Sequence, residues 1–61
     1  MRTWLVKARG SRSQREVAEN VGISRSAYAN IETGRRSASV KVAKKIASEL
    51  KLEWLIFFDD K

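Results

Sequence analysis

Two short helical patterns separated by a single glycine occupy residues 13–34, SQREVAENVGISRSAYANIETG. Ser13 and Glu16 have the spacing of a capping box, in which each side chain bonds a free backbone N–H at the start of a helix. A helix is therefore predicted over residues 14–21, and Gly22 ends it. Three apolar residues at helical spacing form its inner face: Val17, Ala18 and Val21.

The second pattern has its own start and stop residues. Ser24 is a preferred helix-capping residue and Gly34 favours the conformation that ends helices, so a helix is predicted over residues 25–33. Its inner face is formed by Ala27, Tyr28 and Ile31. Its opposite face carries polar or small residues: Arg25, Ser26, Ala29, Asn30 and Thr33. We expect Tyr28 to pack in the core and the opposite face to remain outside it.

The flanking sequence predicts three more short helices. One is capped by Thr3 and precedes the central stretch; another, capped by Ser39, spans residues 40–50. Its apolar stripe consists of Val40, Ala43, Ile46, Ala47 and Leu50. A fifth helix is predicted over residues 53–58, although the apolar run within it also fits an extended segment. The expected fold is one all-α domain, residues 1–61, built as a compact bundle of five short helices.

Composition argues against an enzyme or a metal protein. The 61 residues include no cysteine and no histidine, which removes disulfides, thiolate zinc sites and the commonest general base. The remaining Ser, Lys and carboxylate residues form no recognisable catalytic constellation, so we expect no cofactor and no metal. The start of the chain lacks a signal peptide pattern, and no apolar run approaches the roughly 20 residues of a membrane span. These features predict a cytoplasmic protein.

The distribution of charge suits a polyanionic partner. Thirteen basic and seven acidic side chains give a net charge of +6. Eleven of the basic but only three of the acidic side chains precede Glu49, so a basic body is followed by an acidic end. A polyanion approached from one side would match this distribution, although a basic surface without a partner has the same composition.

Two short helices joined by a tight turn at Gly22 make a helix-turn-helix pattern. In such an arrangement the second helix fits the major groove of DNA, and the first crosses the backbone. The free N–H groups at the start of the first helix favour a phosphate, and Ser13, Gln14 and Arg15 would lie there. The pattern therefore predicts a double-stranded DNA partner.

Three ordered segments resemble the Cro/phage-repressor helix-turn-helix family, also called XRE-like. Residues 13–18, 21–26 and 30–36 read SQREVA, VGISRS and NIETGRR. The family reads roughly S/T-Q-x-x-L/V-A, then G-I/V-S/T, then I/L-E-x-G-K/R. The resemblance covers nearly the whole chain, because residues 39–40 and 43–47 also match the family's fourth helix. It implies five helices, a recognition helix after the turn, and dimeric binding to a dyad operator. It also implies a bacterial or phage-encoded protein that is associated with the nucleoid.

The resemblance also implies roles for individual residues. Four residues on the outer face of the second helix would read bases: Arg25, Ser26, Ala29 and Asn30. Five would contact the DNA backbone: Gln14, Ser24, Gly34, Arg35 and Arg36. Their positions in the chain add three more expected backbone contacts: Arg15, Thr33 and Lys41. The family pairs an arginine of the first helix with the glutamate that matches Glu32, and Arg9 is the candidate here. Two alternatives stay open: Arg25 could be a solvated surface arginine, and Asn30 could face solvent or a phosphate.

Two features depart from the family pattern. The connection between Arg9 and Gln14 is shorter than in many members, and Arg12 stands where an apolar residue is usual. The proline that the family often has near residue 38 is Ala38 here. The departures concern the docking of the first helix and the loop before the fourth, not the central pattern.

The apolar run of residues 54–58 raises a separate question. One helix buries about half of such a run, so Ile56 or Phe57 is expected to remain exposed in a monomer. Exposed apolar side chains often mark partner surfaces, which predicts a homodimer contact at these two residues. Alternatively, all five side chains close the base of a small core against the first helix.

The combined prediction is a phage-type transcriptional repressor that binds double-stranded DNA sequence-specifically, with no small-molecule ligand. A homodimer would place its two helices of residues 25–33 in successive major grooves about 34 Å apart. Two other functions fit parts of the same sequence. One is a helix-turn-helix module that binds protein, as an antirepressor or an antitoxin component; the other is a non-specific nucleic-acid binder.

Overall fold

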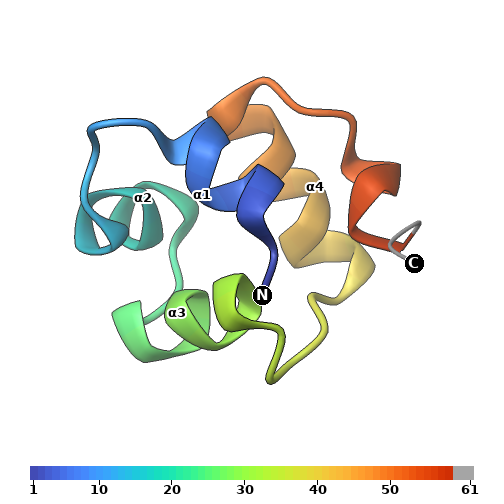
Figure 1. Ribbon diagram of the computed structural model, residues 1–61, viewed down its shortest axis with the longest axis horizontal. Helices are drawn as coiled ribbons and strands as arrows, with labels where there is room; N and C mark the ends of the chain where they lie inside the picture. The colour runs from blue at the N-terminus through green and yellow to red at the C-terminus, as the bar shows by residue number, and fades with distance from the viewer. Residues whose placement is uncertain (59–61) are drawn as a thin grey trace.

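The computed structural model describes residues 1–58, which form four α-helices and a 3₁₀ helix, with no strand among them (Figure 1). The elements are α1 (Thr3–Arg9), α2 (Gln14–Val21), α3 (Arg25–Thr33), α4 (Val40–Leu50) and the 3₁₀ helix η1 (Trp54–Phe58). The predicted all-α class is confirmed, although the fifth element is 3₁₀ and not α. The last three residues of the predicted domain, 59–61, lie outside the described part. None of the described helices has the length and hydropathy that crossing a membrane requires.

Local capping chemistry sets the bounds of the central helices. The hydroxyls of Ser13, Ser24 and Ser39 each accept a hydrogen bond from the backbone N–H three residues later, at 3.0, 3.0 and 3.2 Å. Gly22 and Gly34 follow α2 and α3 in the left-handed conformation, with φ of 90° and 87°. Glycine adopts this conformation without the strain that a Cβ would add. The three serine caps and the bounds of α2, α3 and α4 are confirmed.

The first helix begins differently from the prediction. Thr3 is already the first residue of α1, and Arg2 occupies the cap position without a side-chain cap hydrogen bond. The prediction of a Thr3 cap is therefore wrong. Tertiary contacts hold this end instead: Leu5 is fully buried, and the backbone N–H of Arg2 donates to Glu32 O at 2.8 Å.

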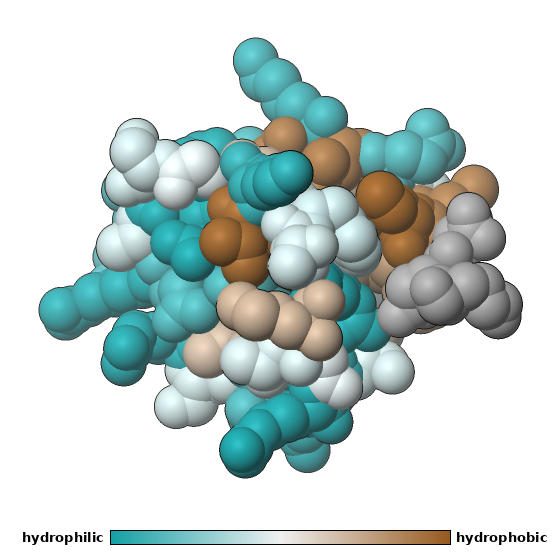
Figure 2. Space-filling model, in the orientation of Figure 1, coloured by the Kyte–Doolittle hydropathy of each residue, from teal (hydrophilic) through white to brown (hydrophobic). Residues whose placement is uncertain are grey.

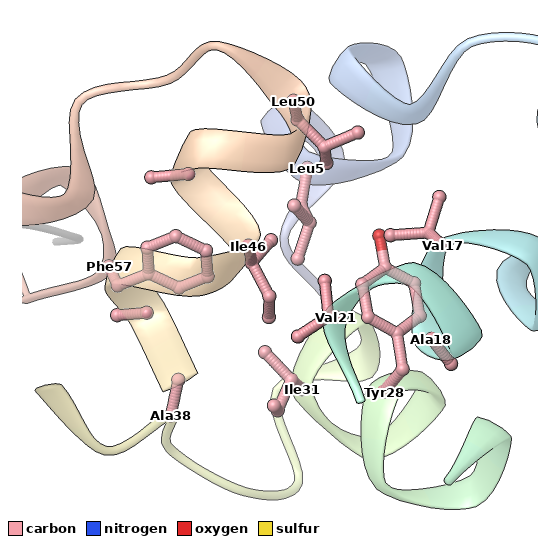
Figure 3. Close-up of a cluster of buried hydrophobic side chains, with 12 residues drawn as sticks. Leu5, Val17, Ala18, Val21, Tyr28, Ile31, Ala38, Ile46, Leu50 and Phe57 are labelled. Carbon is pink, nitrogen blue, oxygen red and sulfur yellow. The ribbon is translucent and has the colours of Figure 1, made fainter. Parts of the chain in front are cut away.

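All the helices contribute to one hydrophobic core (Figure 3). Its buried members are Leu5, Val17, Ala18, Val21, Tyr28, Ile31, Ala38, Ala43, Ile46, Ala47, Leu50 and Phe57. The Tyr28 ring extends from α3 toward Val17 and Ala18 of α2 (Figure 3), so Tyr28 is a core residue, as predicted. Because protein interiors are close-packed, this shared core fixes the outer faces of α2 and α3 relative to each other.

Val40 departs from the predicted apolar stripe of α4. Its side chain is 50% exposed, whereas Ala38 in the preceding loop is only 5% exposed. Ala38 therefore covers the core beside the first turn of α4, the place that the stripe assigned to Val40. The other four members of the stripe are buried as predicted.

In the C-terminal run, residues 54–58, the buried and exposed side chains do not follow the period of an α-helix. Phe57 is 3% exposed and meets Trp4 of α1 edge to face at 5.0 Å between ring centroids, whereas Leu55 and Phe58 are about half exposed. A 3₁₀ helix has three residues per turn, so Trp54 and Phe57 share the inner side and Leu55 and Phe58 share the outer side. The expectation that Ile56 or Phe57 stays exposed is therefore wrong, because Phe57 is buried and Ile56 is partly buried. The alternative that all five side chains close the core is also wrong, because Leu55 and Phe58 are exposed.

Candidate nucleic-acid interface

A tight turn of Gly22, Ile23 and Ser24 joins α2 to α3. The N–H groups of Gly22 and Ile23 both donate to Ala18 O, at 2.8 and 3.0 Å, which satisfies the end of α2. Ile23 then packs against the core, and Ser24 caps α3. The turn thus anchors the start of α3 on both sides.

The outer face of α3 carries the four residues predicted to read bases. Arg25 and Ser26 are exposed, and Ala29 and Asn30 are half-buried. Residues 25 and 29, and residues 26 and 30, are four apart, so they are neighbours on one helix face. In the described part of the chain no ion pair holds Arg25. This face can present a guanidinium, a hydroxyl, a methyl and a carboxamide to a DNA groove.

The start of α2 lies beside the C-terminal end of α3. Gln14 Nε2 donates to Glu32 Oε1 at 2.8 Å. This bond turns one donor of the carboxamide inward and leaves its second N–H and its oxygen for other partners. Arg15 is exposed and lies 3.4 Å from Glu19 one turn further along α2. Gln14 was predicted to contact the DNA backbone, and its amide group is held in place by this bond to α3.

A buried carboxylate joins α1, α2 and α3. Arg9 Nε donates to Glu32 Oε2 at 2.7 Å and Arg9 Nη2 to Glu32 Oε1 at 3.3 Å, which is the pair that the family resemblance implies. Burial alone would raise the pKa of Glu32, but hydrogen bonds from Arg9 and Gln14 outweigh it and hold that pKa below its ordinary value. The hydrogen bond to Glu32 likewise raises the pKa of Arg9. Burial, with the nearby carboxylate, raises the pKa of Tyr28.

The loop after α3 holds the remaining predicted backbone contacts. Arg35, Arg36 and, beyond the loop, Lys41 in the first turn of α4 are all exposed. Arg36 N–H donates to Asn30 O at 3.2 Å, so the loop folds back on the last turn of α3. Thr33 Oγ1 also donates to Asn30 O, at 3.2 Å, which keeps this exposed hydroxyl on the helix end.

The shortened connection between α1 and α2 is closed by polar contacts. Arg9 Nη1 donates to Arg12 O at 2.8 Å, and Arg12 Nη1 donates to Glu49 Oε2 of α4 at 2.8 Å. Asn20 Nδ2 donates to the same Glu49 oxygen at 2.9 Å. An ion pair to α4 thus stands where the family usually has an apolar contact, and the Arg9–Glu32 pair forms despite the shorter connection.

The surface around α2 and α3 is hydrophilic. Figure 2 shows hydrophilic side chains projecting at the left and at the bottom of the view, where Figure 1 places α2 and α3. Hydrophobic residues are visible left of the centre, at the top and at the upper right of this view, the last near η1 (Figure 2). Among residues 1–58 no group of three His, Cys, Asp or Glu side chains could hold a metal ion. The chemistry that this face offers is cationic and hydrogen-bonding.

Known proteins resemble the chain over this same arrangement of helices. A family model described as helix-turn-helix matches residues 5–57. The chain belongs to the helix-turn-helix family. In this helix-turn-helix protein α2 is the first helix of the motif and α3 the second, the helix that such domains place in the major groove of DNA.

One relative extends the similarity beyond the motif. It is a protein of Bacillus subtilis (strain 168) described as an uncharacterized HTH-type transcriptional regulator, YqaF. The two sequences are 47% identical over 62 residues, which cover 98% of this helix-turn-helix protein and 82% of the relative. No solved structure gives a significant match.

Two arginines to which sequence analysis gave no role join distant segments of the fold. Arg12 was noted only as a departure from the family pattern, and Arg2 was not singled out. Arg2 is 9% exposed, and its Nη1 donates to Ile31 O at 2.7 Å. The Arg2–Ile31 and Arg12–Glu49 contacts each join residues more than 25 positions apart, so no local spacing could have indicated them.

Proposed function

We propose that this helix-turn-helix protein is a transcriptional regulator that recognises a dyad operator in double-stranded DNA and acts as a phage-type repressor. The observation that carries the proposal is the outer face of α3, which presents four polar or small side chains and no exposed carboxylate, since Glu32 is buried. The Bacillus relative, described as an HTH-type transcriptional regulator, supports a regulatory role. The resemblance to Cro and phage repressors supports repression.

In the proposed complex α3 lies in the major groove and its neighbours contact phosphates. Arg25 reads a guanine edge, and Asn30 reads an adenine or bonds a phosphate. Ser26 and Ala29 contact bases from the same face, Ala29 through a thymine methyl group. The start of α2, the loop after α3 and Lys41 contact the backbone, as do Ser24 and Thr33 at the two ends of α3.

A homodimer is the assembly that we propose on DNA. Leu55 and Phe58 expose about half of their side-chain surface on the outer side of η1, and Val40 exposes as much at the start of α4. We therefore propose that the dimer contact, which the sequence placed at Ile56 and Phe57, is made by Leu55 and Phe58 instead. Two copies joined at this end would place their α3 helices in successive major grooves about 34 Å apart and occlude a promoter.

A selection from random duplex DNA tests the proposal. It is run near physiological salt, where non-specific binding weakens to a Kd of roughly 10⁻⁴ to 10⁻⁶ M. We expect enrichment of an inverted repeat whose half-sites are about one helical turn apart. Salt-dependent binding without enrichment would identify a non-specific binder, and no binding by the folded protein would refute the DNA function.

Arg25→Ala tests base reading directly. We expect this variant to lose about 1–3 kcal/mol of discrimination at one base position of the half-site, because a bidentate arginine–guanine contact has that value. The measurement is a binding titration against the selected operator and against its single-base variants. A loss of equal size on every sequence would instead make Arg25 a phosphate contact.

Arg35→Ala and Arg36→Ala test the backbone contacts. Each variant should bind all duplexes more weakly by a similar factor and should reduce the slope of log K against log salt by about one unit. The slopes are measured on an operator duplex and on an unrelated duplex. Lys51→Ala, at the far end of α4, serves as the control that removes a positive charge outside the interface. An unchanged slope in either arginine variant would remove that residue from the footprint.

A protein-binding module is the second candidate function, and the apolar pair Leu55 and Phe58 favours it. Such a module would capture a protein partner through η1 and show no DNA retention. Charge-neutralising variants at Arg25, Arg35 and Arg36 would then leave partner binding unchanged. Loss of partner binding on those substitutions would instead place the contact on the α3 face.

A further inference from the structure

The C-terminal end of α3 is held by the start of the chain. Arg2 N–H donates to Glu32 O at 2.8 Å, and Arg2 Nη1 donates to Ile31 O at 2.7 Å. The same Nη1 donates to Arg36 O at 3.5 Å. Figure 1 shows the N-terminus beside the end of α3, and a Cβ placed on Gly34 would lie 3.9 Å from Arg2 Nη1. One buried arginine thus links the recognition helix to the loop that follows it.

These contacts do what a C-cap does for a helix. The last four carbonyl groups of an α-helix have no partner within it, and a positive charge near them is favoured by the helix dipole. Ile31 O accepts a hydrogen bond from Gly34 N–H at 3.2 Å and a shorter one from Arg2. Arg2 is only 9% exposed, and these carbonyl groups replace part of the hydration that its guanidinium loses.

The backbone of Arg36 is fixed on both sides by this arrangement. Its N–H donates to Asn30 O in α3, and its carbonyl accepts from Arg2. The side chains of Arg35 and Arg36 project from this fixed backbone and are exposed. Their position relative to the reading face of α3 therefore depends in part on the guanidinium of Arg2, a residue that is itself buried.

We propose that Arg2 is a positioning residue for DNA binding: it sets the place of Arg35 and Arg36 relative to α3. The inference rests on the proposed DNA function and adds a residue to it. A planar guanidinium suits this role because it offers donors in a fixed geometry, whereas a lysine ammonium acts as a point charge on a flexible stem. Removing the Arg2 side chain leaves the backbone of Arg36 with the hydrogen bond from its N–H to Asn30 O.

Arg2→Gln and Arg2→Lys test the proposal, with Arg12→Gln as the matched control. Like Arg2, Arg12 is an arginine that joins distant segments, but it is only partly buried and its partner is Glu49 of α4. All variants are studied at a temperature where urea titrations show them folded. Arg2→Gln should bind an operator duplex about tenfold more weakly, the scale of one charge-assisted hydrogen bond. Its salt slope should fall by about one unit.

Two further readouts separate positioning from general stability. Arg12→Gln should lower stability and keep the wild-type salt slope. Arg2→Gln should cost no further affinity in a protein that already carries Arg35→Ala and Arg36→Ala, because residues that act through one another are not additive. If Arg2→Gln fails to fold, Arg2→Lys decides, with an expected rise in the hydrogen-exchange rate of the Arg36 amide and a partial loss of affinity.

The outcomes distinguish this inference from the function on which it rests. Absence of duplex binding by the unaltered protein would overturn the DNA function and, with it, the role of Arg2. Binding by the unaltered protein, with a wild-type salt slope in the folded Arg2 variants or an additive double-mutant cycle, would overturn only the positioning role. An unchanged hydrogen-exchange rate of the Arg36 amide in Arg2→Lys would also overturn only the positioning role.

Discussion

Glu32→Gln is expected to lower the free energy of unfolding by about 3 kcal/mol. Glu32 is 1% exposed and accepts hydrogen bonds from Arg9 and Gln14, so a neutral amide in its place leaves the Arg9 charge without a counter-ion. The value lies at the lower end of the usual 3–5 kcal/mol range because the Arg9 side chain keeps 18% exposure. For a domain of this size the total stability is about 3–9 kcal/mol, so the variant loses a large share of it.

Urea titration followed by circular dichroism measures this loss, and Glu19→Gln is the matched control. Glu19 pairs with Arg15, but both side chains are more than two-thirds exposed, so the control should change stability by less than about 0.5 kcal/mol. Equal losses in the two glutamine variants would contradict the structural role of the buried pair.

The same carboxylate gives stability a defined dependence on pH. The pKa of Glu32 is lower in the folded chain than its ordinary value of 4.5, so the charged carboxylate stabilises the fold above that pH. This contribution is lost as the pH falls from 4.5 toward the folded-state pKa. The stability difference between the wild type and Glu32→Gln should therefore be constant near neutral pH and shrink below about pH 4.5.

Sequence alone predicted the elements whose boundaries are encoded locally. The caps at Ser13, Ser24 and Ser39 each depend on a serine and the N–H three residues later, and the ends at Gly22 and Gly34 depend on the backbone freedom of one residue. Such signals act within a few positions of the chain. These signals also predicted the outer face of α3. Once the first residue of a helix is known, the helical period fixes which of its residues share a face.

The remaining features depend on contacts between distant segments. Arg2 and Arg12 find carbonyl and carboxylate partners 29 and 37 positions away, which no spacing rule indicates. The helical period of the apolar residues in α4 predicted that Val40 is in the core. In the structure Val40 is exposed, and Ala38 of the preceding loop is buried instead. The family resemblance supplied the Arg9–Glu32 pair, whereas the bond from Gln14 to the same carboxylate emerged only from the fold.

Phe57→Ala should lower stability far more than Phe58→Ala, although the two residues are adjacent and identical. Phe57 is 3% exposed and packs against Trp4, so its truncation should cost about 3–5 kcal/mol of stability. Phe58 is 48% exposed, so its truncation should change monomer stability by no more than about 1 kcal/mol. The measurements are urea titrations of both variants under conditions where the protein is monomeric.

The second half of this prediction concerns assembly. If the outer side of η1 is the homodimer contact, Phe58→Ala and Leu55→Ala should weaken self-association and cooperative operator binding while the fold stays intact. Sedimentation at rising protein concentration, with and without operator DNA, measures both. A large loss of stability in both phenylalanine variants would mean that Phe58 also belongs to the core. Unchanged association in a folded Phe58→Ala protein would move the dimer contact away from η1, with the exposed Val40 at the start of α4 the next surface to test.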